Sequence, residues 1–137
     1  MTIKNPERNE INEILANNKR IAIVGLSSNP ERTSYMVAEV MQNAGYEIIP
    51  VNPVVDEVLG VKAVSSLKEI EGPVDIVNVF RKSEFLPEIA KEAVAIKAKV
   101  FWAQLGLVNE EAYNYLKEND MTVIMDRCIK IELAKMK

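Results

Sequence analysis

The hydrophobic positions of this chain form short apolar runs that alternate with segments of helical periodicity. The runs are nearly continuous, which is typical of parallel strands that are buried on both faces. The segments between several of them carry apolar residues at i, i+3 and i+4, the spacing of an amphipathic helix. The pattern predicts six strands, at residues 20–25, 46–52, 61–64, 74–80, 99–104 and 121–126.

Helices are expected before, between and after these strands. The predicted helical segments are residues 6–17, 35–44 and 83–97, a helix that begins after 109, a brief turn at 67–70, and a short helix or docked segment at 128–137. Small polar residues stand where these helices begin, and such residues accept hydrogen bonds from free N–H groups of the first turn. We therefore expect N-caps at Asn5, at Thr33 or Ser34, at Ser83 and at Asn109.

Repeated strand–helix units predict the fold class. Joined by right-handed crossovers, they form an α/β, Rossmann-like, doubly wound parallel sheet with three αβα layers. We expect one domain over residues 1–137 with its core at about 11–132, and the strand order 3-2-1-4-5-6. In such a sheet, a ligand binds outside the carboxyl ends of the strands.

The composition of the chain argues against several classes of function. The chain of 137 residues is 48% hydrophobic and 27% charged, with a net charge of −3 and no run of Lys or Arg, so nucleic acid is not an expected partner. No apolar run approaches the ~20 residues that cross a bilayer, and we expect no membrane association. The single cysteine, Cys128, cannot form an internal disulfide, which suits the cytoplasm.

The chain contains no histidine. This excludes nucleophile systems that depend on histidine and the usual catalytic zinc sites, so no metal is expected. Asp, Glu, Lys or Tyr could still act in catalysis, which leaves an enzyme possible, but we expect a protein without catalysis of its own.

The loop at residues 25–34, "GLSSNPERTS", follows the first strand and offers an anion site. Gly25 permits a tight turn, and free N–H groups at the start of the next helix favour phosphate. Arg32 could add a charged fork to the same anion. The loop is equally consistent with an ordinary strand–helix connection that ends in a serine cap.

Two features oppose a bound dinucleotide. The loop has only the first glycine of the G-x-G-x-x-G fingerprint. After the second strand stand Asn52 and Pro53, with no carboxylate before Asp56 to hold a ribose hydroxyl. An NAD(P)-binding oxidoreductase or redox sensor is therefore the alternative function and not the leading one.

The ends of the later strands add candidate binding groups. Phe80, Arg81 and Lys82 supply an aromatic ring and two cations after the fourth predicted strand, although alone they fit a core residue and two solvated bases. Trp102 also fits a core position, whereas Gln104 before a loop is harder to explain by packing.

Five blocks of the sequence carry a resemblance to a known family. They are "VGLSSNPERTSYMV", "GYEIIPVNP", "VDIVNVFR", "VFWAQLG" and "VIMDRCIKIE", in this order. In order and spacing the chain resembles the small bacterial CoA-binding proteins, which are similar to the N-terminal CoA-binding domain of the succinyl-CoA synthetase alpha subunit. The resemblance covers residues 11–132.

The resemblance implies coenzyme A or an acyl-CoA as a small-molecule nucleotide ligand, with a protein partner or homo-oligomer as further possibilities. Position by position, it implies these binding residues: Gly25, Leu26, Ser27, Ser28, Arg32, Ser34, Asn52, Pro53, Phe80, Arg81, Trp102, Ala103 and Gln104. The chain departs from many relatives at Val54, where they carry a lysine that could pair with a phosphate, so this charge must come from elsewhere or affinity is weaker.

The resemblance also limits the expected chemistry. The synthetases work through a phosphorylated histidine in a second domain, and this chain has no histidine, so we expect no ligase reaction from it alone. A further hypothesis is that Cys128, if its sulfur lies near the pantetheine end of the ligand, forms a mixed disulfide with CoA.

Overall fold

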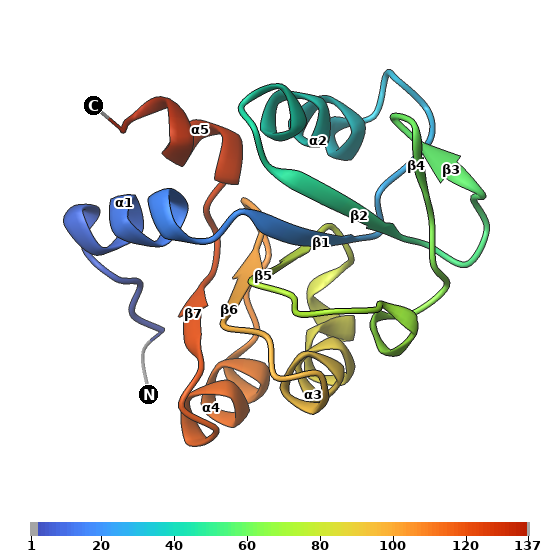
Figure 1. Cartoon of the computed structure of the whole chain (residues 1–137). Helices are drawn as coiled ribbons and strands as arrows, with labels where there is room; N and C mark the ends of the chain where they lie inside the picture. Colours follow the sequence, from blue (N-terminus) through green and yellow to red (C-terminus); the bar gives the residue numbers. More distant parts are fainter. Residues whose placement is uncertain (1–2, 137) are drawn as a thin grey trace.

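The computed structural model, described over residues 3–136, contains a five-stranded parallel sheet (Figure 1). Its strand order is β2-β1-β5-β6-β7, and every neighbouring pair is parallel. The strands are β1 (Arg20–Val24), β2 (Glu47–Val51), β5 (Ile76–Val79), β6 (Val100–Ala103) and β7 (Thr122–Ile124). The order reverses between β1 and β5, which confirms the predicted Rossmann-like α/β class.

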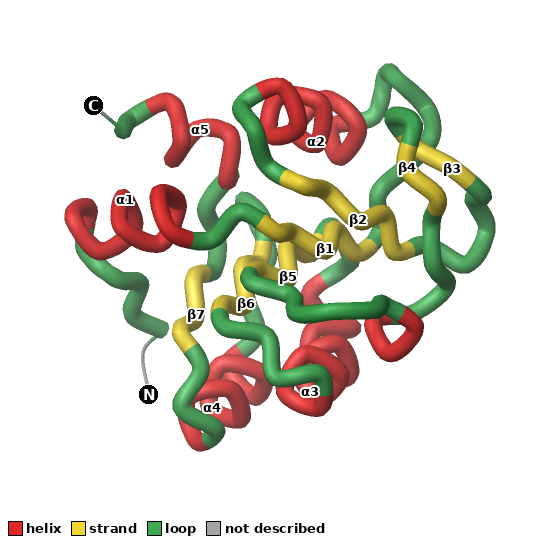
Figure 2. Tube along the Cα trace, viewed as in Figure 1, coloured by secondary structure: helices red, strands yellow, loops and turns green. Residues whose placement is uncertain are grey.

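Helices cover both faces of this sheet. Figures 1 and 2 show three helices on one face: α1 (Arg8–Asn17), α2 (Thr33–Asn43) and α5 (Ile129–Ala134). The other face is covered by α3 (Leu86–Ala95) and α4 (Glu110–Glu118). Two short 3₁₀ helices, η1 (Leu67–Glu69) and η2 (Ser83–Phe85), complete the second layer. The sheet between these two groups of helices gives the molecule three layers, αβα.

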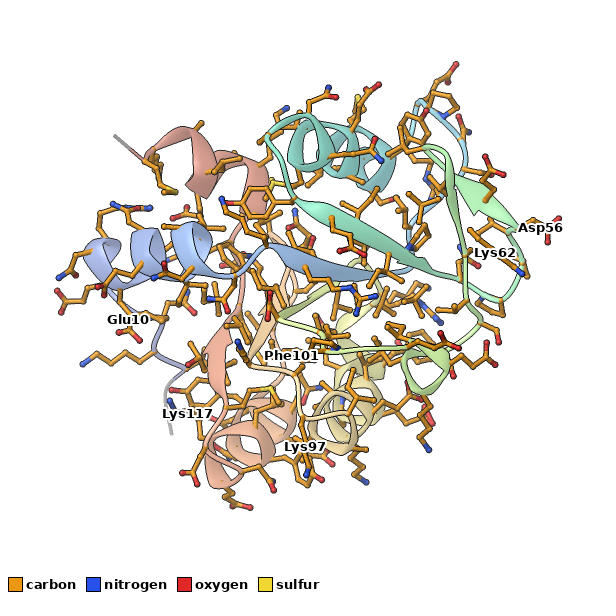
Figure 3. The ribbon with its side chains drawn as sticks, viewed as in Figure 1. Glu10, Asp56, Lys62, Lys97, Phe101 and Lys117 are labelled. Atoms are coloured by element: carbon orange, nitrogen blue, oxygen red, sulfur yellow. The ribbon has the colours of Figure 1, made fainter. Side chains whose placement is uncertain are left out.

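The strands divide the core into two clusters. Successive side chains of a strand point to opposite faces of a sheet. In β6, Val100 and Trp102 therefore pack beneath α1, α2 and α5, whereas Phe101 and Ala103 pack with α3 and α4. Figure 3 shows Phe101 in the interior, while Lys97 and Lys117 lie at the periphery. Apolar residues on both faces explain why the strands read as continuous apolar runs.

The third predicted strand, residues 61–64, is confirmed in part. β4 (Val61–Lys62) forms its first half, but it pairs with β3 (Glu57–Val58) in a small antiparallel hairpin that was not predicted. Leu59 and Gly60 make its turn with positive φ values of 53° and 79°. Only Val64 reaches the main sheet, through one parallel bridge to Val51, so the outer position in the expected order is occupied by a single residue.

The expected caps had different outcomes. Asn109 caps α4 as predicted, and its side-chain oxygen accepts from the Ala112 N–H at 2.9 Å. Asn5 does not cap α1, because its side chain exchanges two hydrogen bonds with the backbone of Met125. Ser83 does not cap α3 either, and its hydroxyl accepts from the Val108 N–H. Both side chains join distant segments, which a local pattern does not reveal.

Candidate functional site

The loop after β1 turns sharply at Gly25. Its φ is +86°, a conformation that favours glycine. A Cβ atom there would lie 3.0 Å from the Phe80 carbonyl oxygen and 3.0 Å from Cδ of Arg81. The Gly25 N–H donates to the Val51 carbonyl at 2.8 Å. Gly25 thus lets the ends of β1, β2 and β5 approach one another closely.

Beyond Gly25, side chains within the loop fix its shape. The Ser27 N–H donates to the Ser34 hydroxyl at 3.0 Å, and the Ser27 hydroxyl accepts from the Asn29 N–H at 3.0 Å. Ser34 is buried and faces back to the loop, so the prediction that it or Thr33 caps α2 is wrong. The N-cap is Arg32, whose side chain makes no capping hydrogen bond.

The start of α2 consequently presents free donors. Within residues 3–136, the N–H groups of Ser28, Thr33, Ser34 and Tyr35 have no acceptor, whereas the Met36 N–H bonds the Arg32 carbonyl. Free amides at the positive end of a helix dipole attract anions. This loop can therefore accept a phosphate group without first breaking its own hydrogen bonds.

The end of β2 is held against the same loop. The Asn52 side-chain nitrogen donates to the Leu26 carbonyl at 3.1 Å, and its oxygen accepts from the Val54 N–H at 3.0 Å. Pro53 is exposed beside it. Leu26 itself is 0% exposed, and its carbonyl is occupied by Asn52, so the structure closes this expected binding residue off from a ligand. Val54 is 85% exposed and contributes no charge at this edge.

The ends of β5 and β6 are tied together by two amides. The Gln104 side-chain oxygen accepts from the Ile129 N–H at 3.1 Å and from Nδ2 of Asn78 at 3.3 Å. Asn78 also donates to the Trp102 carbonyl at 3.2 Å. Asn78 was missed by the sequence analysis, although a lone amide inside the apolar run of residues 74–80 was a signal for it.

Trp102 and Ala103 do not form an open wall. Both side chains are 0% exposed and belong to the core, and the Trp102 indole donates to the Arg127 carbonyl at 2.9 Å. Gln104 alone of the three expected residues lines a pocket.

Three cations gather at this edge. Arg32, Arg81 and Lys82 are exposed, and none of them forms an ion pair with any other residue between 3 and 136. The Arg81 guanidinium stacks on the Phe85 ring at 4.7 Å from its centroid, a cation–π contact. Cations without a carboxylate partner next to free amides favour a bound anion.

Two pockets flank Arg81. One, the apolar pocket, measures about 550 Å³ and is lined by Thr33, Phe80, Arg81, Lys82, Gln104, Leu105, Leu107, Cys128 and Ile131. The other, the polar pocket, measures about 270 Å³ and is lined by Val24, Val51, Pro53, Ser65, Ser66, Arg81, Phe85, Glu88, Ile89 and Glu92. Arg81 lines both pockets, and apolar side chains make up most of the lining of the first.

A separate hollow of about 490 Å³ lies between α3 and α4. Its lining includes Glu110, Glu111 and Glu118 against one cation, Lys91. No residue of a strand, of the loop after β1 or of the segment after β5 lines this hollow. The edge beside Arg81 is therefore the better candidate for an anionic ligand.

Two other site types find no support in the described part of the chain. Residues 3–136 hold no group of three or more Cys, Asp or Glu side chains placed to bind a metal ion. Among the same residues, no helix has the length and apolar character that crossing a bilayer requires.

Comparison with known proteins gives consistent similarities. Residues 19–134 match the sequence model of a family described as the CoA binding domain. The chain is 67% identical to the Bacillus subtilis protein YneT over 96% of this chain and 98% of that protein. It is 32% identical to the alpha subunit of ADP-forming acetate–CoA ligase II from Pyrococcus furiosus, over 74% of this chain but only 23% of that subunit.

Solved structures share the fold over the whole chain. A Pyrococcus horikoshii protein superimposes with a TM-score of 0.93 at 33% identity and covers 99% of both chains. A Thermus thermophilus protein superimposes with a TM-score of 0.91 at 32% identity, over 95% of this chain and 98% of that one.

Proposed function

The chain belongs to the CoA binding domain family, and we propose that it binds coenzyme A or an acyl-CoA at the carboxyl edge of its sheet, without catalysing a reaction on its own. One observation carries this proposal beyond the family. Free backbone donors at the start of α2 and the cations Arg32, Arg81 and Lys82 stand beside two pockets of different polarity. A CoA molecule has matching parts, because its phosphates join a polar adenosine to a long pantetheine arm.

The diphosphate fits the loop after β1. The free N–H groups of Ser28 and Thr33 would donate to its oxygens, and Arg32 would supply positive charge. Gly25, Ser27 and Ser34 would act by shaping this loop, through the close approach and the hydrogen bond described above. A phosphate there gains charge-assisted hydrogen bonds, each worth about 1.5–3 kcal/mol.

The two ends of the ligand would occupy the two pockets. Adenosine would lie in the polar pocket near Pro53, with Asn52 holding the loop beneath it. Pantetheine would pass Phe80 and Gln104 into the apolar pocket. Arg81 lines both pockets, so it would contact the phosphates between them and replace the charge that Val54 does not provide.

An NAD(P) enzyme is the weaker candidate. The end of β2 offers the Asn52 amide, already bonded to Leu26 and Val54, in place of the carboxylate that would hold a ribose hydroxyl. The part of the ligase alpha subunit that this chain matches is also less than a quarter of that subunit, and the chain has no histidine. A binding domain that senses or carries CoA, or that serves a catalytic partner, fits these facts.

Calorimetric titration of the protein with CoA, dephospho-CoA, NAD and NADP tests this function. We expect CoA to bind with the highest affinity, and dephospho-CoA to bind at least tenfold more weakly, because it lacks one charge-assisted phosphate contact. NAD should bind most weakly. Equal affinities for NAD and CoA would contradict the proposal.

A further inference from the structure

Cys128 lies in the wall of the apolar pocket. It follows β7 and directly precedes α5, and its side chain is 9% exposed, with that pocket beside it. The rest of the pocket wall includes Phe80, Leu105 and Ile131, which are apolar. Within residues 3–136, the thiol makes neither a disulfide nor a hydrogen bond. The position of the sulfur allows contact with whatever fills this pocket.

Gln104 gives an independent sign that the pocket takes a polar ligand. Its side chain is only 5% exposed, and its oxygen is held in place by the Ile129 N–H and Asn78. Its orientation is fixed, because a nitrogen at that position could not accept from the Ile129 N–H. The Gln104 amide nitrogen has no acceptor among the described residues, and it is not one of the enclosed atoms that lack a partner, so it is accessible from the pocket that the residue lines.

An amide donor that borders a pocket finds its acceptor in water or in a ligand that fills the pocket. A pantetheine arm carries amide carbonyl groups that can accept from such a donor, and it ends in a thiol. The apolar lining of the pocket therefore suits the chain of this arm, and the Gln104 amide suits its carbonyl groups. The Cys128 thiol lies where the sulfur of the arm would end.

We propose that Cys128 undergoes thiol–disulfide exchange with a disulfide of CoA and holds CoA as a reversible mixed disulfide. This rests on the proposed function, because the exchange requires the pantetheine arm to enter the apolar pocket. The co-reactant is CoA disulfide or another mixed disulfide of CoA. CoA thiol alone supplies no oxidant and leaves Cys128 reduced.

The exchange conserves atoms and electrons. Cys128 loses its proton to solvent, and its sulfur attacks the disulfide sulfur of the CoA held in the pocket. A bond forms between the Cys128 sulfur and that sulfur, and the original sulfur–sulfur bond breaks. The second CoA leaves as a thiolate and takes up a proton. Cys128 is oxidised, and the leaving CoA sulfur is reduced.

Intact-mass spectrometry of the reduced protein tests the proposal. The protein is incubated with CoA disulfide or, in parallel, with glutathione disulfide, which lacks the nucleotide. We expect one CoA adduct per chain, released by dithiothreitol and formed at least tenfold faster than the glutathione adduct. Excess desulfo-CoA, which has no sulfur, should slow the reaction with CoA disulfide. No CoA adduct, or equal rates with the two disulfides, would overturn the proposal.

A pair of exposed residues provides a matched comparison. Leu105 lines the apolar pocket and is 62% exposed, whereas Val108 is 45% exposed and does not line it. Leu105→Ser should slow CoA adduct formation about tenfold, and Val108→Ser should leave the rate unchanged. Equal rates in both variants would count against the pocket as the route to Cys128.

Calorimetry with CoA under reducing conditions separates this proposal from the proposed function. The reduced protein should bind CoA and form no adduct, because CoA thiol supplies no disulfide for the exchange. CoA binding together with no adduct from CoA disulfide would refute only the exchange. Absence of CoA binding to the reduced protein would refute the proposed function itself.

Discussion

The turn at Gly25 is the point at which three strand ends converge, and replacing it with alanine is a sharp test of that geometry. The substitution adds one methyl group at a φ of +86°. That methyl would lie 3.0 Å from the Phe80 carbonyl oxygen and 3.0 Å from Cδ of Arg81. The Arg81 side chain can move aside, but the Phe80 carbonyl belongs to the backbone that follows β5 and must shift with it.

The expected loss has two parts. A left-handed conformation costs a residue other than glycine about 1–2 kcal/mol. Forcing an added methyl against packed backbone costs a further ~1–3 kcal/mol. Gly106 offers a matched control, because its φ is +88° and a Cβ atom there would meet nothing within 4 Å. Gly106→Ala should therefore show only the conformational part, and Gly25→Ala should lose about 1–3 kcal/mol more.

Urea unfolding followed by circular dichroism measures both losses. The free energy of unfolding must depend on urea concentration with the same slope in both variants and the unmodified protein. A shift in the urea concentration at the midpoint then reports a change in stability alone. If Gly25→Ala and Gly106→Ala are destabilised equally, to within about 0.5 kcal/mol, then Gly25 does not pack closely against the Phe80 carbonyl, and the reasoning is refuted.

Three further predictions concern single side chains. Arg81→Met should weaken CoA binding at least tenfold in calorimetry and reduce its dependence on salt, because a charge-assisted phosphate contact is lost; an unchanged affinity would remove Arg81 from the site. Asn109→Ala should destabilise the protein by about 1 kcal/mol in urea unfolding, since the Ala112 N–H loses its cap, and no loss would show that the cap is not stabilising. Burial raises the pKa of Tyr46 above its ordinary value of 10.0, and its hydroxyl donates to the Leu15 carbonyl at 2.5 Å. The folded state therefore holds this proton more tightly than the unfolded chain, so stability is full below about pH 10 and falls as pH rises through and above that value. The fall should be smaller in Tyr46→Phe, and an identical pH profile in the variant would contradict the assignment.

The sheet could be predicted from the sequence because its strands carry a strong signal. Short, nearly continuous apolar runs such as residues 74–80 and 99–104 are typical of strands that are buried on both faces. The hairpin of β3 and β4 was missed, because its strands have two residues each and its turn places Leu59, not the usual Asn or Asp, at positive φ.

The sequence indicates where the candidate site lies better than it indicates how its residues are arranged. The loop after β1, Arg81 and Gln104 follow from strand ends that must meet at one edge of the sheet. The role of Ser34 did not follow, since its hydroxyl bonds the Ser27 N–H seven residues earlier and not its own helix. Trp102 lies in β6 and Gln104 directly follows that strand, but only the structure shows that the first is closed in the core and the second borders a pocket.

The crystal structure of the protein with CoA tests the central claim most directly. It should show the diphosphate at the free N–H groups of Ser28 and Thr33, Arg81 against the phosphates, and pantetheine beside Gln104 in the apolar pocket. CoA bound in the hollow between α3 and α4, or an edge that stays empty at saturating CoA, would contradict the account.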